Sequence, residues 1–186
     1  MSVQRSVLRP VVIAGLVILV FITAVAAQTP AGRDGSPSAP ANLNQLMRAV
    51  LFVNSNVIFA AQDADPAGVK PDEQTSTSTN PLSGLYGGWQ AVENSSLALA
   101  EAANLLTVPG RVCENGKPAP TGNADWARFV AGLRAAGMTA YRAALSKNQD
   151  AILEASDGVV TACANCHEVY RDKGSLGGQL GARCVK

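Results

Sequence analysis

Three residues that could together hold an iron porphyrin lie within five consecutive positions. Cys163, Cys166 and His167 form the pattern C-x-x-C-H. On an α-helix, positions i, i+3 and i+4 share one face. Two thiols there can add across the two vinyl groups of a haem, while the imidazole ligates its iron. The pattern therefore predicts one covalently attached haem c, with Cys163 and Cys166 as thioethers and His167 as the proximal axial ligand.

Two other kinds of site also use a C-x-x-C pair. A redox dithiol usually opens a helix that follows a strand, and a zinc site needs further Cys or His ligands at close spacing. The chain has four cysteines and one histidine, and neither a strand pattern nor another Cys or His lies near the motif. We therefore favour haem attachment over both. The single histidine also excludes a bis-His haem and a zinc site with two or three imidazoles.

The amino terminus is expected to be an export signal. Arg5 and Arg9 precede an apolar run from Val11 to Ala27, which ends in the A-x-A-like triplet Ala24-Val25-Ala26. These are the features of a secretory signal peptide over residues 1–27. The run is 17 residues long, at the lower limit for a membrane span, so an uncleaved membrane anchor is the alternative. With either a cleaved signal peptide or an uncleaved anchor, the rest of the protein is exported, and we expect it in the periplasm.

Composition limits the remaining function classes. The chain has 186 residues, of which 47% are apolar and 16% charged, enough for one domain with a sizeable core. A net charge of +1 and an aromatic content of 5% argue against nucleic-acid binding. Loss of residues 1–27 would leave 13 basic and 14 acidic residues. Residues 28–41, rich in Pro, Gly, Ser and Ala, predict a disordered linker before a domain over 42–186.

Four segments with helical periodicity must position the motif. They cover about residues 42–62, 85–107, 124–146 and 149–173, with Asn42 and Asn123 as candidate caps and Gly174 as the stop. Loops rich in Pro and Gly fill 63–83 and 108–123. We expect an all-α fold, an antiparallel up-down-up-down four-helix bundle with the haem near one end; an irregular all-α domain is the alternative. The predicted inward residues are Leu43, Leu46, Met47, Val50, Val57, Ile58 and Ala61; Trp89, Val92, Ser96, Leu99, Ala103 and Leu106; Trp126, Phe129, Leu133, Ala136, Ala140 and Ala144; and Ile152, Val159, Cys163, Cys166 and Tyr170.

The residues after the motif carry a family resemblance. The stretch C-A-N-C-H-E-V-Y-R, ending in Tyr170 and Arg171, matches C-x-x-C-H-x-x-[FY]-R. With the bundle pattern over 42–173, it resembles the class II c-type cytochromes, the cytochrome c′ family. The resemblance implies either a low-spin one-electron carrier or a five-coordinate protein that binds nitric oxide or carbon monoxide. It also implies redox partner proteins and frequent homodimers. The long second loop, Cys113 and Cys184 depart from the family pattern.

The residue on the far side of the iron would decide between the two functions. In the expected topology, the start of the first helix lies level with the end of the last. Met47 is about 6 Å from that end and His167 about 9 Å, whereas Met138 is about 20 Å away. The low-spin branch of the family carries Met early in the first helix. We therefore expect Met47 to be the distal ligand and the protein to carry electrons without catalysing a reaction. The alternative for Met47 is an ordinary core residue, because a Met in an apolar stripe usually fills the core. A peroxidase is a weaker alternative, because the chain has no second histidine to act as a distal base.

Five further residues are expected near the haem. Arg171, and less strongly Arg48, could pair with a haem propionate, because a half-buried carboxylate needs a charge partner. The side chain of Tyr170 is expected to pack against the porphyrin. Cys113 and Cys184 lie in segments that meet at the haem end, and we expect a disulfide between them, which would close a loop of about 70 residues. Two free thiols or intermolecular bridges are the alternatives.

Overall fold

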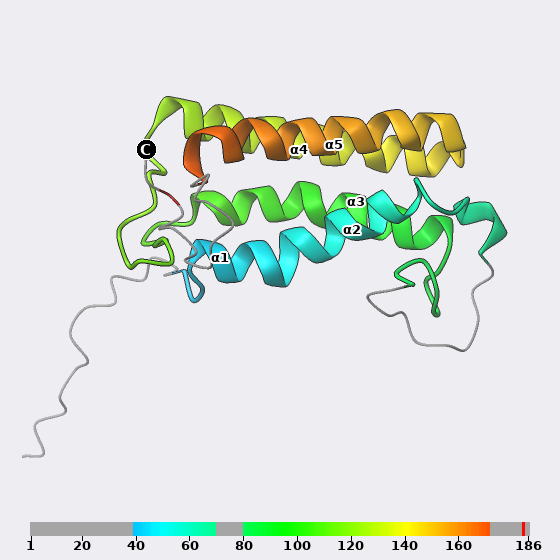
Figure 1. Cartoon of the computed structure of the whole chain (residues 1–186), viewed down its shortest axis with the longest axis horizontal. Coiled ribbons are helices and arrows are strands. Elements are labelled where there is room, and N and C mark those ends of the chain that lie inside the picture. The colour runs from blue at the N-terminus through cyan, green and yellow to red at the C-terminus, as the bar shows by residue number, and fades with distance from the viewer. Residues whose placement is uncertain (1–38, 70–79, 172–183, 185–186) are drawn as a thin grey trace, which may run out of the picture. The chain divides into compact units, whose positions relative to one another are not determined.

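A computed structural model describes residues 39–69, 80–171 and Cys184. The chain divides into two units, Met1–Asp34 and Gly35–Lys186, and the described residues all belong to the second. The predicted signal peptide and residues 28–38 of the predicted linker lie outside the described residues. Within the described part the fold is helical, with no strand and one isolated bridge between Val112 and Pro118 (Figure 1). The prediction of an all-α domain is confirmed at this level.

The first predicted helix is one continuous rod that contains a π-helical turn. It consists of α1 (Leu43–Leu46), the turn η1 (Met47–Leu51) and α2 (Phe52–Ala60). Asn42 caps its start as predicted, because the Gln45 amide donates to the Asn42 side chain while the Asn42 amide donates to the Gln45 side chain.

The π turn changes which side chains of this rod face the core. Within it the Phe52 amide donates to the Met47 carbonyl, five positions earlier, and the Asn54 side chain donates to the Val50 carbonyl at 2.8 Å. A π turn adds one residue to the local repeat. Leu51 is buried, although it was not among the predicted inward residues, and Val50 is half-buried and packs against the core cluster as predicted.

The second helix begins four residues later than predicted. It runs as α3 (Trp89–Ala102) and the 3-10 turn η3 (Ala103–Thr107). Gly88 adopts φ +61°, in the region that glycine tolerates best, and breaks the helix before Trp89. Leu85 and Tyr86, predicted to start the helix, are 77% and 60% exposed in the preceding turn. The predicted inward residues of this helix are all confirmed as buried: Trp89, Val92, Ser96, Leu99, Ala103 and Leu106.

The last two helices are joined by a very short connection. α4 (Ala124–Ser146) has the predicted bounds, and α5 (Gln149–Tyr170) follows after Lys147 and Asn148. Lys147 is left-handed, with φ 52°, and the Asn148 side chain accepts from the Ala151 amide to cap α5.

α5 ends at Tyr170 rather than near Lys173, because another segment takes its last carbonyl. The Tyr170 carbonyl accepts the Cys184 amide at 2.7 Å, and Arg171 is already extended. The predicted stop at Gly174 lies outside the described residues.

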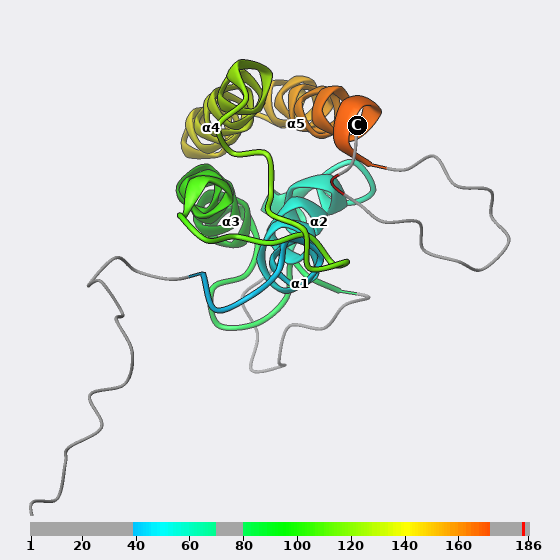
Figure 2. The ribbon, with the colours of Figure 1, turned by 90° about the vertical axis from the view of Figure 1, so that its left-hand side faces the viewer.

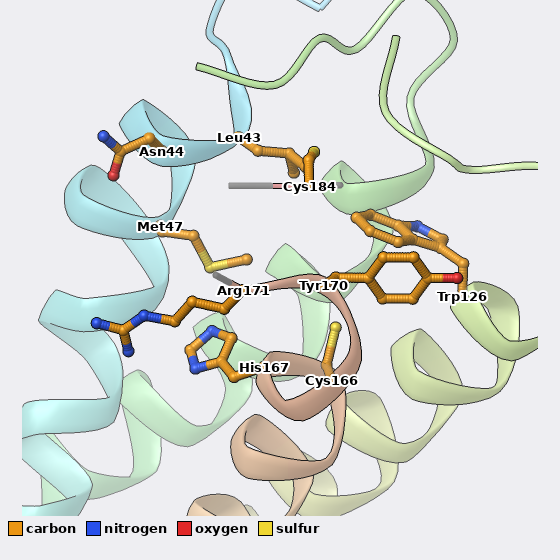
Figure 3. A pocket seen from close by; sticks show the side chains of 9 residues that line it. All are labelled: Leu43, Asn44, Met47, Trp126, Cys166, His167, Tyr170, Arg171 and Cys184. Atoms are coloured by element: carbon orange, nitrogen blue, oxygen red, sulfur yellow. The ribbon is translucent and has the colours of Figure 1, made fainter. Parts of the chain in front are cut away.

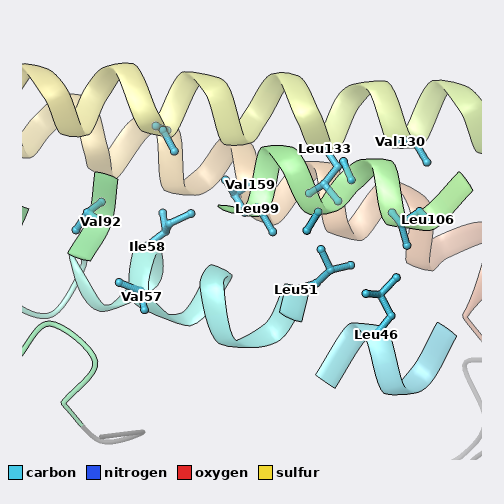
Figure 4. Packing of buried hydrophobic residues seen from close by; sticks show 14 of the residues in the cluster. Leu46, Leu51, Val57, Ile58, Val92, Leu99, Leu106, Val130, Leu133 and Val159 are labelled. Carbon is cyan, nitrogen blue, oxygen red and sulfur yellow. The ribbon is translucent and has the colours of Figure 1, made fainter. Parts of the chain in front are cut away.

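The four helical rods pack around a common core. α3 packs against α2 and α4, and α5 packs against α4 and α2, so each rod has two neighbours (Figure 2). Their buried apolar side chains form one cluster, which includes Leu46, Leu51, Ile58, Val92, Leu99, Leu133 and Val159 (Figure 4). α3 and α4 approach closely at Gly137, where an added Cβ would lie 2.8 Å from the Ala100 nitrogen. Among the described helices, none combines the length and apolar character needed to cross a membrane.

Candidate functional site

The predicted site residues gather at one end of the helical rods. A cavity there lies between the start of the first rod, the start of α4 and the end of α5. Figure 3 shows the side chains that line it: Leu43, Asn44, Met47, Trp126, Cys166, His167, Tyr170, Arg171 and Cys184. The structure therefore brings Met47 and the motif residues Cys166 and His167 to one place from segments about 120 positions apart in the sequence.

The C-x-x-C-H motif lies within α5, near its carboxyl end. Cys163 and Cys166 are both free thiols and both half-buried, and each packs against the core cluster. His167 is half-buried and lines the cavity. Because the helix is unbroken to Tyr170, the three side chains occupy positions i, i+3 and i+4 of one face, as the motif predicts.

The surroundings of the two thiols favour their neutral form. Burial raises the pKa of Cys163. Burial, followed by the nearby Cys163 and Asp125, raises the pKa of Cys166 to about 11. The carboxyl end of a helix carries the negative end of its dipole, which also disfavours a thiolate. The pair is therefore protonated at neutral pH, unlike the reactive dithiols that lie at helix amino ends.

Met47 approaches the cavity from the opposite side to α5. It is the first residue of the π turn, and its side chain is half-buried. Figure 3 shows this side chain extending from the first rod toward the end of α5 that carries His167. Met138, the other methionine weighed as a ligand, is half-buried in α4 and does not line this cavity.

Tyr170 is held rigidly in the cavity wall. Its hydroxyl donates to the Asp125 carboxylate at 2.5 Å and accepts from the Asn123 side chain at 3.1 Å. Its ring meets the rings of Trp126 and Phe129 edge to face, at 5.0 and 6.2 Å between centroids. The Asn123 side chain thus binds Tyr170 and does not cap α4, although Asn123 occupies the predicted cap position.

The two arginines proposed as propionate partners have different positions. Arg171 is exposed and lines the cavity, directly after α5. Arg48 is exposed on the first rod and does not line the cavity. Of the two, the geometry makes only Arg171 available to a ligand carboxylate in this cavity.

The expected Cys113–Cys184 disulfide is present and forms part of the cavity wall. The two Cα atoms are 5.7 Å apart, and 71 positions of sequence separate them. Both residues are buried. The bond joins the loop after α3 to the segment after α5, and it places Cys184 directly at the cavity.

A buried arginine that the sequence reasoning did not single out holds the loop at this end. Arg111 is only 4% exposed. Its guanidinium donates to the Ala41 carbonyl at 2.6 Å and to the Leu105 carbonyl at 2.6 and 3.1 Å. It therefore ties the loop both to the start of the first rod and to the end of η3. Burial lowers the pKa of Arg111, yet an arginine stays charged.

The residues at this end of the rods include the groups that hold a covalently attached haem, but the cavity itself is small. Two thiols, an imidazole and a thioether hold c-type haems; here the Cys166 thiol, His167 and Met47 line the cavity, whereas the Cys163 thiol lies on the same face of α5 but outside the lining. The enclosed space is about 50 Å³, against about 300–1,000 Å³ for ordinary ligand sites. A macrocycle would therefore fit only after the side chains that line the cavity rearrange. Within the described residues, no group of three or more His, Cys, Asp or Glu side chains is arranged to hold a bare metal ion.

Comparison of the chain with protein-family models, with curated proteins and with solved structures found no match.

Proposed function

We propose that the chain is an exported, monohaem c-type cytochrome of the class II kind, and that it carries single electrons between redox partner proteins. The proposal includes a periplasmic location, an up-down-up-down course of the four rods and one haem near the end where the cavity lies. The two-residue connection between α4 and α5 supports this course, because neighbouring helices joined by so short a link run antiparallel.

One observation carries the proposal. Met47 and His167 line the same cavity. His167 belongs to the attachment motif, and Met47 was expected beside it from the distances along the helices and from the position of Met in the low-spin branch of the family that the sequence resembles. Their meeting supplies an imidazole and a thioether on two walls of one space, which is the ligand pair of a low-spin electron carrier.

In this proposal the residues of the chain act as anchors and ligands. Cys163 and Cys166 would bind the group covalently, His167 and Met47 would supply ligands to its metal, and Arg171 would pair with a carboxylate of the group. When bound, the haem would supply a metal that exchanges one electron between its ferric and ferrous forms. A thioether ligand from Met47 would leave no site for small gases, so that electron exchange is the function.

The redox-dithiol alternative is not supported by this arrangement. A dithiol reductant needs a stabilised thiolate, usually at the amino end of a helix. Cys163 and Cys166 are near the carboxyl end of α5 and have raised pKa values.

Covalent attachment is tested by producing the full chain in cells that export and mature c-type cytochromes. We expect the purified protein to be red and to keep one haem, measured as added mass, after denaturation in acid. A variant with Cys163→Ser and Cys166→Ser should lose that mass. A colourless protein with the mass of the bare polypeptide would contradict the proposal.

The role of Met47 is tested by Met47→Leu. We expect the reduced wild type to have the sharp α band of a low-spin haem, and Met47→Leu to give a high-spin spectrum that shifts on adding carbon monoxide. Met138→Leu, which changes a methionine away from the cavity, should leave the spectrum unchanged. A low-spin spectrum that survives in Met47→Leu would remove Met47 as a ligand. A high-spin wild type would instead favour binding of nitric oxide or carbon monoxide.

A further inference from the structure

The cavity is lined by two cysteines, one with a free thiol and one in a disulfide bond. Cys166 is a free thiol and lines the cavity, and Cys184 also lines it but is bonded to Cys113. Cys113 is buried in the loop behind and does not line the cavity. Of the two bonded cysteines, Cys184 is therefore the one that lies near the attachment motif, and its sulfur is already bonded to Cys113.

The observed partner of Cys184 is not the one that loop-closure statistics favour for it. Cys113 and Cys184 are 71 positions apart, whereas Cys166 and Cys184 are only 18 apart. The probability of loop closure falls as about the 3/2 power of loop length, so an unfolded chain meets the Cys166–Cys184 pair about eightfold more often. The fold must reverse this preference.

Three contacts in the described residues explain how the fold does so. The Leu43 amide donates to the Val112 carbonyl at 2.9 Å, which joins the loop to the first rod. Arg111 holds the same loop against Ala41 and Leu105. The Cys184 amide donates to the Tyr170 carbonyl at 2.7 Å. These contacts place Cys113 and Cys184 together once the bundle has formed.

We propose that the Cys113–Cys184 disulfide is a protecting bond, which prevents Cys184 from reacting with the neighbouring motif thiols and so keeps Cys163 and Cys166 available as thiols. The bond thereby does more than stabilise the fold, because it decides which two of the four cysteines remain free. This inference does not require that haem is bound, since it concerns only the sulfur atoms of the chain.

The competing reaction is ordinary thiol–disulfide exchange with a disulfide oxidant. In a chain without Cys113, the Cys184 thiolate attacks oxidised glutathione, forms a mixed disulfide and releases one reduced glutathione. The small fraction of Cys166 that is ionised then attacks the Cys184 sulfur, and the second glutathione leaves. Two cysteine thiols are oxidised to one disulfide, one glutathione disulfide is reduced to two thiols, and the two protons pass to the departing glutathiones.

The test uses Cys113→Ser, which leaves Cys184 unpaired. The full chain is folded without haem, exposed to oxidised glutathione, alkylated and digested with trypsin. Cleavage after Lys147, Arg171 and Arg183 places Cys163 and Cys166 in one peptide and Cys184 in another. We expect a cross-linked pair of these peptides in Cys113→Ser, at least tenfold above its level in wild type, where Cys184 should instead be linked to the peptide that begins at Val112.

Two variants distinguish the effect of an unpaired Cys184 from the effect of losing the disulfide. Cys184→Ser also lacks the disulfide but leaves only Cys113 unpaired, and it should give no cross-link between the peptide that holds Cys163 and Cys166 and another cysteine peptide. Cys113→Ser combined with Cys184→Ser should do the same. Circular dichroism checks that each variant remains helical. The proposal is overturned if Cys113→Ser gives no such cross-link, or if Cys184→Ser blocks the motif thiols equally.

A second readout rests on the proposed function. In cells that mature c-type cytochromes, Cys113→Ser should lower covalent haem per polypeptide several-fold, and the double variant should restore it. If no variant, wild type included, carries haem, the proposed function fails while the peptide result still decides the present inference.

Discussion

At the scale of single residues, Cys166 shows how the environment of a side chain sets its reactivity. Burial, Cys163 and Asp125 together raise its pKa to about 11 from an ordinary value of 9.0. The thiol is therefore neutral over the whole physiological range. The haem attachment proposed for Cys166 needs a thiol that is not oxidised during export. A low fraction of thiolate favours this, because the thiolate is the reactive form.

The raised pKa gives a prediction for the haem-free chain. Alkylation of Cys166 by iodoacetamide should rise with pH around a midpoint of about 11 in the folded chain, and near 9 in urea. The folded pKa lies above the unfolded one, so the stability associated with the neutral thiol is fully present below pH 9 and is lost as pH rises through about 11. Peptide mass spectrometry measures the alkylation rate.

Asp125→Asn provides the control, because it removes one of the charges that raise the pKa of Cys166. Its midpoint should lie below that of wild type. A folded wild-type midpoint at or below 9 would contradict the description of this site.

At the scale of helices, the contact between α3 and α4 depends on the absence of one methyl group. A Cβ at Gly137 would lie 2.8 to 3.0 Å from the Ala100 backbone. Gly137→Ala gains helix propensity, yet the clash should dominate and lower the free energy of unfolding by about 1–3 kcal/mol. Urea denaturation followed by circular dichroism measures the change.

Gly132→Ala is the matched control in the same helix. No atom lies within 4 Å of a Cβ at Gly132, so this variant should gain about 0.5–1 kcal/mol of stability from helix propensity alone. Equal effects of the two substitutions would show that the close approach at Ala100 does not limit the packing.

Local patterns allowed much of the fold to be predicted from the sequence. The buried residues Trp89 through Leu106 follow from the alternating three- and four-residue spacing, and α4 has its predicted bounds. Three features were not predicted. The π turn makes Leu51 a buried residue beside Val50, the Cys184 amide binds the last carbonyl of α5, and Arg111 binds carbonyls 6 and 70 positions away.

The candidate site was predictable to a similar extent. The motif indicated Cys163, Cys166 and His167, and helix length together with the family resemblance indicated Met47. Of these four residues, Met47, Cys166 and His167 line the cavity. The sequence could not rank Arg48 below Arg171, because both are charged residues near the expected haem and only the packing shows that Arg48 lies outside the cavity.

At the scale of the whole molecule, the Cys113–Cys184 bond joins segments that the helices alone do not connect. By the chain-entropy relation, a closed loop of 71 positions contributes about 4 kcal/mol to folding. The variant with Cys113→Ser and Cys184→Ser should therefore unfold at a lower urea concentration, with about that loss in the free energy of unfolding. A loss below about 1 kcal/mol would show that the hydrogen bonds of Arg111 and the Cys184 amide already order this end.

The π turn at Met47–Leu51 also affects how this chain should be aligned with others. A protein with the same four rods but an unbroken α-helix here would have one residue fewer in this stretch. An ungapped alignment of the two would place Met47 one position away from its spatial equivalent, a rotation of about 100° around the helix axis. The alignment would then show another residue opposite Met47 even where the second protein has a methionine in the equivalent place. The equivalent of Met47 should therefore be sought both at the aligned position and at the position next to it.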